Sequence, residues 1–457
     1  MRASKYNFTV YDRDGNLLLY NFLTGLSSLT KVSKHSVEQF EKLFLTTDTI
    51  NNDLYESHNK IIDMLVKKGI LLNGDFNEEA LLDSIHYSEV YNNKLNLVIL
   101  PTGACNFKCS YCYESSQSFC RESMTNVNQK ALLKFAQRNI HKYNGLHVSW
   151  FGGEPMLEPG AINYLSTNLI KMCNDRFLPY SSEITTNGYF LNAEMFDMLY
   201  RLKVYTYMVT IDGFKDHHDK LRFTADGKGS YDTIIENLLR IRDNKQYKFA
   251  HIIIRINMCN GFLDIMNDFV DFLAESFSGD PRFSFRFVPV GLNNMDLNIS
   301  VNPEELFFRL FENDTYMSKL YNSELAFLSL QPEKKCIASM KNAYVISPDL
   351  NVHKCSSFFD YVENKIGYIN SKGDLLVDEA KHRQWYLMPK FVKDQPESCK
   401  NCFYFPCCRN SSPGCPVRYK KEQPWQSCVV KNENLINQLK ETIIFASNKY
   451  SCDTIVL

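Results

Sequence analysis

Three cysteines on one short loop are the residues of this chain best suited to chemistry. Cys105, Cys109 and Cys112 are spaced C-x3-C-x2-C, and aromatic Tyr111 stands immediately before the third cysteine. Thiolates are soft donors that select iron–sulfur clusters or zinc. A structural zinc site requires a fourth protein ligand, whereas a [4Fe–4S] cluster held by three cysteines leaves one iron open for a substrate. The spacing therefore predicts a cluster with one open iron.

A second group of cysteines occupies the C-terminal part of the chain. Eight of the 15 cysteines fall between Cys336 and Cys428. The segment CKNCFYFPCC has C-x2-C-x5-C spacing, and ISPDLNVHKCSSF is typical of a hairpin that delivers Cys355. Paired C-x2-C elements also suit zinc ribbons, so this group fits either zinc or iron–sulfur clusters.

Composition restricts the partners and the compartment. A length of 457 residues favours two or three domains. The net charge of −1 gives no overall attraction for nucleic acid or anionic membranes. The N-terminus lacks the apolar segment of a signal peptide, and no run approaches the roughly 18 apolar residues of a membrane span. A reducing cytoplasm is expected, where clustered cysteines indicate metal binding or catalysis.

Alternating strand and helix patterns must position the first cysteine loop. The apolar run LNLVIL predicts a buried strand that Pro101 and Gly103 end. Five more strands are predicted at GLHVSWF, SEITT, YTYMVTI, HIIIRIN and FSFRFVPV. Amphipathic helices are expected between them, at about 126–141, 162–174, 193–202, 231–244 and 262–277. This alternation is typical of an α/β fold with a parallel sheet.

Informative residues follow the predicted strands, where parallel sheets bind ligands. Gly152-Gly153-Glu154-Pro155 follows the second strand; its glycines let the backbone approach a ligand, and its carboxylate can accept from an ammonium group. Thr185-Thr186-Asn187-Gly188 follows the third strand. After the fourth strand comes Ile211-Asp212-Gly213 and then HHDKLR, in which His217 and His218 are predicted to be loop residues. Arg255 and Asn257 should face the same end of the sheet.

The cysteine loop, C-x3-C-x-aromatic-C after the first strand, resembles the signature of the radical S-adenosylmethionine (SAM) enzymes. The resemblance implies a partial (β/α)6 barrel. Its open iron would bind SAM, whose reductive cleavage yields a 5′-deoxyadenosyl radical that abstracts hydrogen from a substrate. It further implies SAM contacts from Glu154 to the ammonium group, Asn187 to the ribose and Arg222 to the carboxylate. The implied cofactor-binding set is Tyr111, Gly152, Gly153, Glu154, Asn187 and Arg222, with Cys105, Cys109 and Cys112 on the cluster.

The C-terminal cysteine layout resembles the SPASM extension, which carries two auxiliary [4Fe–4S] clusters and would bring the total to three. By position, the proximal cluster would use Cys336, Cys355 and Cys415, and the distal one Cys399, Cys402, Cys408 and Cys428. Two departures are visible. Leu350 replaces the family's glycine, and Cys408 and Cys415 are spaced C-x6-C, so that Cys407 could substitute for Cys408. Three cysteines would leave the proximal cluster a fourth position for a substrate thiolate, a carboxylate or water.

Residues 1 to 88 predict a small separate unit. A hairpin turning at Asp14-Gly15, a third strand near 27–32, helices at 33–44 and 53–68 and a wing strand at ILLNG are expected. Ser36 and Gln39 have the spacing of a helix capping box. This order resembles the winged-helix-like domain that recognises precursor peptides, in which a leader peptide adds as an extra strand on the exposed sheet edge. A plain structural cap is the alternative.

Together the resemblances imply a cytoplasmic radical SAM/SPASM oxidoreductase that matures a ribosomally made peptide. Its domains would be 1–88 for peptide recognition, 89–315 for the barrel and 316–457 for the auxiliary clusters. A peptide cysteine would form a thioether, as in sactipeptide and ranthipeptide synthases, with an electron donor such as flavodoxin or ferredoxin. Alternatives are a carbon–carbon crosslinking maturase and a sulfatase-maturing-type protein oxidase. An iron–sulfur sensor without turnover is disfavoured by the intact SAM segments.

Overall fold

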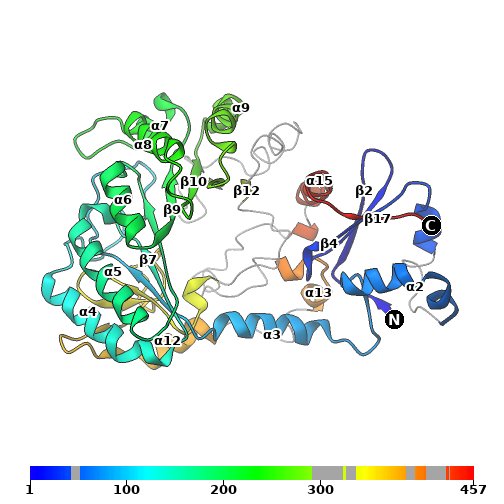
Figure 1. Cartoon of the computed structure of the whole chain (residues 1–457), viewed down its shortest axis with the longest axis horizontal. Helices are drawn as coiled ribbons and strands as arrows, with labels where there is room; N and C mark the ends of the chain where they lie inside the picture. Colours follow the sequence, from blue (N-terminus) through cyan, green and yellow to red (C-terminus); the bar gives the residue numbers. More distant parts are fainter. Residues whose placement is uncertain (43–51, 291–322, 326–335, 388–396, 408–428, 432) are drawn as a thin grey trace.

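The computed structural model describes residues 1–42, 52–290, 323–325, 336–387, 397–407, 429–431 and 433–457. Two lobes are visible: one is built on a large sheet flanked by helices, and the other on a small sheet beside which both ends of the chain lie (Figure 1). Helix α3 (Glu78–Val90) runs between the lobes. Of the helices described, none is long and apolar enough to cross a membrane.

Six parallel strands form the centre of the large sheet, in the order in which they occur along the chain. They are β6 (Leu95–Ile99), β7 (Leu146–Trp150), β8 (Tyr180–Thr186), β9 (Val204–Thr210), β10 (His251–Met258) and β11 (Phe283–Pro289). The helices between them are α4 (Asn126–Asn139), α5 (Pro159–Asn174), α6 (Ala193–Arg201), α7 (Lys215–Leu221), α8 (Tyr231–Asp243) and α9 (Phe262–Leu273). The predicted α/β architecture is confirmed.

Side-chain alternation explains how each strand serves both the core and the site. On β10, Ile252, Ile254 and Ile256 are fully buried in the main hydrophobic core. Because successive residues of a strand point to opposite faces, Arg255 and Asn257 face the other side of the sheet. Apolar residues therefore pack the sheet against its helices, while polar residues remain available on the opposite face.

Short strands extend this sheet at both edges, to 11 strands among the residues described. At one edge, β12 (Ser323–Leu325) lies parallel to β11. At the other edge, β13 (Ala343–Ile346) lies parallel to β6 and forms an antiparallel pair with β14 (Asn351–His353). Beyond them lie β15 (Lys365–Ile369) and β16 (Leu375–Val377), followed by helix α12 (Glu379–Tyr386). The predicted hairpin before Cys355 is thus part of the barrel sheet.

The small sheet combines the N-terminal strands with the last strand of the chain. Its order is β17-β4-β3-β2, with β2 (Asn7–Tyr11), β3 (Leu17–Asn21), β4 (Gly25–Val32) and β17 (Asp453–Ile455). The β2–β3 turn contains Gly15 with a φ of 82°, as the Asp14-Gly15 pair predicted. The wing strand β5 (Leu71–Leu72) pairs with β1 (Arg2–Ala3).

Helices cover both faces of the small sheet. Leu17, Leu19 and Val32 share one apolar cluster with residues of α1 (Val37–Phe40) and α2 (Asn52–Lys67). On the opposite face, Leu18 and Tyr20 pack in a cluster with residues of α15 (Glu433–Lys449) and with part of the segment that follows α13 (Glu397–Lys400). The N-terminal sheet is therefore completed by C-terminal segments.

Two local predictions were wrong. Ser36 precedes α1, but its side chain makes no capping hydrogen bond; its hydroxyl accepts from the backbone N–H of Leu457 at 2.8 Å. His217 and His218 lie on helix α7 rather than in a loop. In both cases a tertiary contact, absent from the local pattern, decides the conformation.

Candidate active site

A cavity of about 380 Å³ lies at the carboxyl ends of the parallel strands. It brings together residues from the cysteine loop, from the segments that follow β7 and β8, and from the C-terminal region. The lining residues used below are Cys105, Cys109, Tyr111, Cys112, Gly152, Gly153, Asn187, Arg222, Arg255, Asn257, Ser356 and Ser357. Three thiols and two guanidinium groups thus share one cavity.

The close approach of the cysteine loop requires glycine at two positions after β7. A Cβ at Gly152, whose φ is 123°, would lie 2.3 Å from the carbonyl oxygen of Thr102. A Cβ at Gly153 would lie 2.2 Å from the carbonyl oxygen of Ala104, which also accepts a hydrogen bond from the Glu154 backbone N–H at 2.9 Å. Only glycine permits this approach. The segment therefore clamps the loop that carries the cysteines.

The Glu154 carboxylate joins the loops that follow β7 and β8. It is fully buried and accepts from the Thr186 hydroxyl at 2.9 and 3.0 Å, from the Asn187 backbone N–H at 2.8 Å and from the Met156 backbone N–H at 3.0 Å. Burial raises its pKa to about 7, and these hydrogen bonds oppose the rise. These contacts give Glu154 a positioning role; its contact with the SAM ammonium group stays a prediction.

Asn187 connects the same loops to the cysteine segment. Its amide nitrogen donates to Asn106 Oδ1 at 2.8 Å, and its amide oxygen accepts from the backbone N–H of Tyr189 at 3.0 Å. Asn106 lies directly after Cys105. The asparagine predicted to face the ribose is therefore held at both ends while it lines the cavity.

A buried network surrounds the Tyr111 hydroxyl. This hydroxyl donates to Asp212 Oδ2 and accepts from Arg222 Nη1 at 2.7 Å and from Asn257 Nδ2 at 3.0 Å. Asp212 Oδ1 accepts from the Asn257 backbone N–H at 3.0 Å. Arg255 Nε donates to the Asn257 amide oxygen at 2.8 Å. The aromatic residue of the cysteine motif thus ties the cysteine loop to β9 and β10.

Asp212 and His218 belong to this network, although the sequence analysis assigned neither of them to the site. The Asp212 backbone N–H donates to His218 Nδ1 at 3.1 Å, and His218 Nε2 lies 3.1 Å from the Ser230 hydroxyl. That hydroxyl donates to the carbonyl of Arg222 at 2.7 Å, so His218 Nε2 carries the proton. Burial lowers the pKa of His218 well below its usual value, and the ring is neutral. Only the position of Asp212 after β9 hinted at this arrangement.

Arg222 is the cavity residue best placed for an anion. It is only 7% exposed, its Nε lies 3.9 Å from Asp212 Oδ2, and that Nε has no hydrogen-bond partner among the residues described. Its guanidinium carbon lies 5.8 Å from the centre of the Phe107 ring. A carboxylate would satisfy a buried guanidinium donor of this kind.

Comparison with known proteins identifies the domain that carries this site. Residues 99–273 match the model of the radical SAM superfamily. This chain carries a radical SAM domain. It is 27% identical over 336 residues to a cysteine-type anaerobic sulfatase-maturating enzyme of Clostridium novyi (strain NT), covering 69% of this chain and 87% of the relative.

Two solved structures share the fold. The AdoMet-bound structure of native anSMEcpe aligns with a TM-score of 0.56 and 18% identity, over 78% of this chain and 97% of that one. Streptococcus suis SuiB bound to its precursor peptide SuiA aligns with a TM-score of 0.50 and 16% identity, over 95% of this chain and 99% of that one. The second alignment includes nearly all of both chains.

The residues present fit the cofactors of a radical SAM domain, SAM and a [4Fe–4S] cluster. Cys105, Cys109 and Cys112 provide three soft donors in one cavity. Desolvation by its neighbours raises the pKa of the Cys105 thiol to about 12, and coordination to iron would stabilise its thiolate. Arg222 has a buried donor without a hydrogen-bond partner among the described residues, and its contact with the SAM carboxylate stays a prediction. The cysteine motif, the glycines that clamp its loop and the buried arginine therefore all fit the same two cofactors.

The radical SAM cavity continues to the region of Cys355. Ser356 and Ser357 line the cavity. Gln117, from the loop that follows Cys112, donates to the carbonyl of Ser357 at 2.9 Å and accepts from the Phe359 backbone N–H at 2.5 Å. The β13–β14 turn contains Leu350 with a φ of 63°, where the SPASM pattern has glycine. Leu350 is buried, and its apolar contacts offset the cost of this conformation.

Cys399, Cys402 and Cys407, the described cysteines of the distal region, lie near the small sheet instead. Cys399 and Cys402 pack with Tyr6 and Phe405. Cys407 is buried and its thiol donates to the carbonyl of Phe22 at 3.5 Å. The predicted ligands Cys408, Cys415 and Cys428 lie outside the described residues, so both auxiliary ligand sets stay predictions.

Proposed function

We propose that the chain is a radical SAM/SPASM enzyme that forms a thioether from a cysteine of a ribosomally made precursor peptide. One observation carries the proposal: a single cavity extends from the thiols of Cys105, Cys109 and Cys112 to Ser356 and Ser357, directly after Cys355. A peptide bound there would present a carbon to the SAM side and a sulfur to the Cys355 side.

The chain's own residues have distinct tasks in this proposal. Cys105, Cys109 and Cys112 hold the cluster, and Arg222 binds the SAM carboxylate. Together SAM and the cluster supply the radical that removes hydrogen from the substrate carbon. Gln117 fixes the distance between the two cysteine regions through its two hydrogen bonds. The proximal auxiliary cluster would use Cys336, Cys355 and Cys415, and the distal one Cys399, Cys402, Cys408 and Cys428.

Peptide recognition is assigned to residues 1–88, with the barrel at 89–315 and the auxiliary domain at 316–457. The SuiB structure, which contains a precursor peptide, aligns over 95% of this chain. An extended leader would add to the small sheet by backbone hydrogen bonding. An electron donor such as flavodoxin or ferredoxin completes the partners.

Product mass tests the proposal. The chain is co-expressed anaerobically with short cysteine-containing reading frames, and each peptide is alkylated and weighed. Thioether formation removes two hydrogens and one alkylatable thiol per event while the sulfur stays in the peptide. Loss of hydrogens with all thiols still reactive would indicate a carbon–carbon link and contradict the proposal.

Oxidation of a protein cysteine is the second candidate, favoured by the 27% identity to the cysteine-type sulfatase-maturating enzyme. Conversion of a cysteine to an aldehyde expels its sulfur, whereas a thioether retains it. Sulfur content of the product therefore separates the two functions. A modified protein and unmodified peptides would favour the second.

A further inference from the structure

One edge of the small sheet, beside β4, is occupied by the C-terminal strand of the chain itself. Strand β17 lies parallel to β4, with Asp453 opposite Thr30, Thr454 opposite Lys31 and Ile455 opposite Val32. The Ser33 backbone N–H continues this ladder and donates to the carbonyl of Ile455 at 2.9 Å. A segment more than 400 positions away in sequence therefore completes the edge.

One side chain anchors β17 by burial. Ile455 is 3% exposed and lies in the apolar cluster formed by the sheet and helices α1 and α2, next to Val32, Val37 and Phe40. Leu457 packs at the margin of the same cluster. We call this the Ile455 socket, formed by Leu17, Val32, Val37, Phe40 and Ile62.

Lys68 binds the other end of β17, at its first residue. Lys68 Nζ pairs with Asp453 Oδ2 at 2.9 Å, and the Lys68 side chain is only 13% exposed. The same ammonium donates to the carbonyls of Ser27 at 3.2 Å and Leu29 at 3.1 Å. Because these carbonyls belong to the β4 stretch that precedes the paired residues, Lys68 caps the part of the edge that β17 leaves uncovered.

The resident strand is short and mostly solvated. It contributes three residues, of which Asp453 and Thr454 are exposed, and the next residue, Val456, is 70% exposed. Its hold on the edge thus rests on the buried side chain of Ile455, the half-buried Leu457 with its hydrogen bond to Ser36, one ion pair and a few backbone hydrogen bonds. At the opposite edge, Thr9 and Tyr11 of β2 are exposed, and no comparable socket is found among the described residues.

We propose that β17 is a resident strand which an extended peptide displaces from the edge of β4. The incoming peptide presents a carboxylate to Lys68 and, two residues later, a branched aliphatic side chain to the Ile455 socket. It repeats the Asp453–Thr454–Ile455 pattern in parallel orientation. This inference rests on the proposed function, in which the guest is the leader of a precursor peptide.

Displacement has a thermodynamic signature. A peptide that competes with a resident strand binds more weakly by the fraction of molecules in which the edge is open. If that fraction is about a tenth or less, releasing β17 raises the apparent affinity by about tenfold or more. The site chemistry, in contrast, remains the same in the open and closed forms.

The test uses a fluorescent peptide, Ser-Ser-Asp-Thr-Ile-Val-Leu, which copies residues 451–457 with serine in place of Cys452. Its affinity is measured for the full-length wild type, for Ile455→Asp and for the matched control Val456→Asp. Ile455→Asp places a carboxylate in the socket and releases the strand; Val456→Asp changes an exposed side chain of the same segment. At least tenfold tighter binding to Ile455→Asp alone is expected.

Hydrogen exchange on the wild type tests displacement directly. Excess peptide should speed exchange of the Leu457 amide, which donates to Ser36 in the closed form. No faster exchange at peptide concentrations a hundredfold above those that saturate Ile455→Asp would overturn the proposal, as would equal affinity for all three chains. If Ile455→Asp fails to fold, Asp453→Lys releases the strand by repulsion from Lys68 without burying a charge.

A charge exchange tests the peptide pattern. In the Ile455→Asp variant, in which β17 is released, Lys68→Glu should weaken binding of the peptide that copies Asp453 about tenfold. It should favour a peptide with lysine in place of that aspartate. Unchanged affinities would contradict the predicted acidic residue. The mass of the peptide product of the wild type, measured as described above, tests the proposed function separately, so failure of either idea is recognised.

Discussion

Arg222 with Asp212 and Arg282 with Asp280 are both buried arginine–aspartate pairs, and they lie at opposite ends of the parallel strands. Arg282 precedes β11 and sits at the amino ends, whereas Asp212 follows β9 and sits at the carboxyl ends. The two pairs differ in how completely the protein satisfies them. This difference in hydrogen bonding distinguishes a pair that stabilises the fold from a pair that is prepared to bind a ligand.

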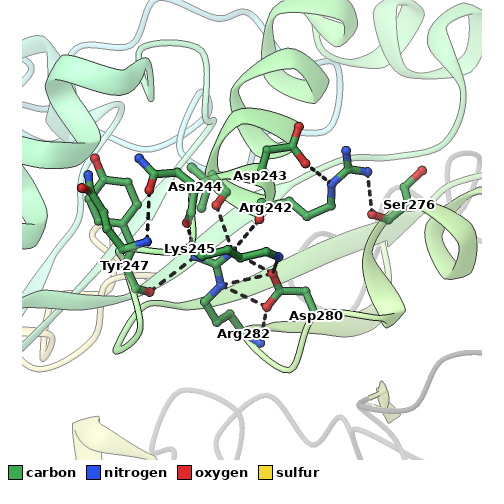
Figure 2. A network of polar contacts seen from close by, with 10 residues as sticks. Arg242, Asp243, Asn244, Lys245, Tyr247, Ser276, Asp280 and Arg282 are labelled. Carbon is green, nitrogen blue, oxygen red and sulfur yellow. Dashed lines mark hydrogen bonds and ion pairs between the residues drawn. The ribbon is translucent and has the colours of Figure 1, made fainter.

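The Arg282 pair is closed within the protein (Figure 2). Its guanidinium donates to both oxygens of Asp280, at 2.7–3.2 Å, and to backbone carbonyls at the end of α8, including Arg242 at 2.7 Å and Asn244 at 2.8 Å. These hydrogen bonds from Arg282 lower the pKa of Asp280. Arg282 therefore satisfies a helix terminus and has no task at the site.

The Arg222 pair is left incomplete on the cavity side. Its Nε has no hydrogen-bond partner among the described residues, and Asp212 is 3.9 Å away. Burial raises the pKa of Asp212, and Arg222 opposes the rise. The same residue types thus stabilise the fold where every donor is used, and prepare a binding site where one is not.

The largest expected effect is the loss of the closed pair. Arg282→Met would leave Asp280 buried without its main partner, at a cost of about 3–5 kcal/mol. The melting temperature should fall by roughly 10 °C, while the folded protein still binds SAM at low temperature. The control is Arg242→Met, because the Arg242 side chain bonds Asp243 and the Ser276 carbonyl in Figure 2, does not contact Asp280 and is partly exposed. Equal shifts in both variants would contradict the comparison.

Neutralising the open pair should affect binding more than stability. In the double variant Asp212→Asn and Arg222→Gln, no buried charge remains alone. SAM affinity, measured anaerobically by calorimetry, should fall about 10- to 100-fold because a charged hydrogen bond is lost. The melting temperature should change by only a few degrees. Unchanged affinity for SAM would remove Arg222 from the cofactor site.

A smaller effect concerns pH. Since burial raises the folded pKa of Glu154 from 4.5 to about 7, its contribution to stability is full below about pH 4.5 and is lost as pH rises through 7. Glu154→Gln should flatten the decline of melting temperature between pH 5 and 8. Burial also raises the pKa of Glu114 to about 7, so part of the decline of melting temperature with pH should remain in Glu154→Gln. Glu158→Gln, at a half-buried position nearby, is the control and should keep the full slope.

The smallest expected effect on melting temperature appears only at acidic pH. Asp280 has a pKa lowered by Arg282, so its contribution is present above the ordinary value of 3.8 and is lost as pH falls below it. The difference in melting temperature between wild type and Asp280→Asn should therefore narrow below about pH 4. A constant difference down to pH 2 would show that the ion pair is not what Asp280 contributes.

Local patterns were sufficient for the parallel sheet. The six strands and five of its helices were predicted because apolar periodicity and turn residues are encoded within each segment. Helix α6, for example, was expected at 193–202 and spans Ala193–Arg201. Helix α7 was missed, because its histidine-rich sequence carries no apolar stripe and His218 is buried through contacts with Asp212 and Ser230.

The site was predictable where a motif is continuous in sequence and less so where it is assembled in space. Cys105, Gly153 and Arg222 do line one cavity. The links between them could not be predicted. The Tyr111 hydroxyl bonds Asp212 after β9, Arg222 after α7 and Asn257 on β10, and no spacing in the sequence indicates that these residues meet. The pairing of β13 with β6 was also missed, since four-residue strands carry little signal of their partner.

The pairing of β4 with β17 has a consequence for synthesis. Ser36 and Leu457, which bond across this junction, are 421 positions apart. At 5–20 residues per second, a ribosome needs roughly 20 to 80 seconds to make the intervening chain. Throughout that time the nascent β4 strand has an unpaired edge, which is a template for aggregation. Translation speed and chaperone supply should therefore affect the yield of this protein.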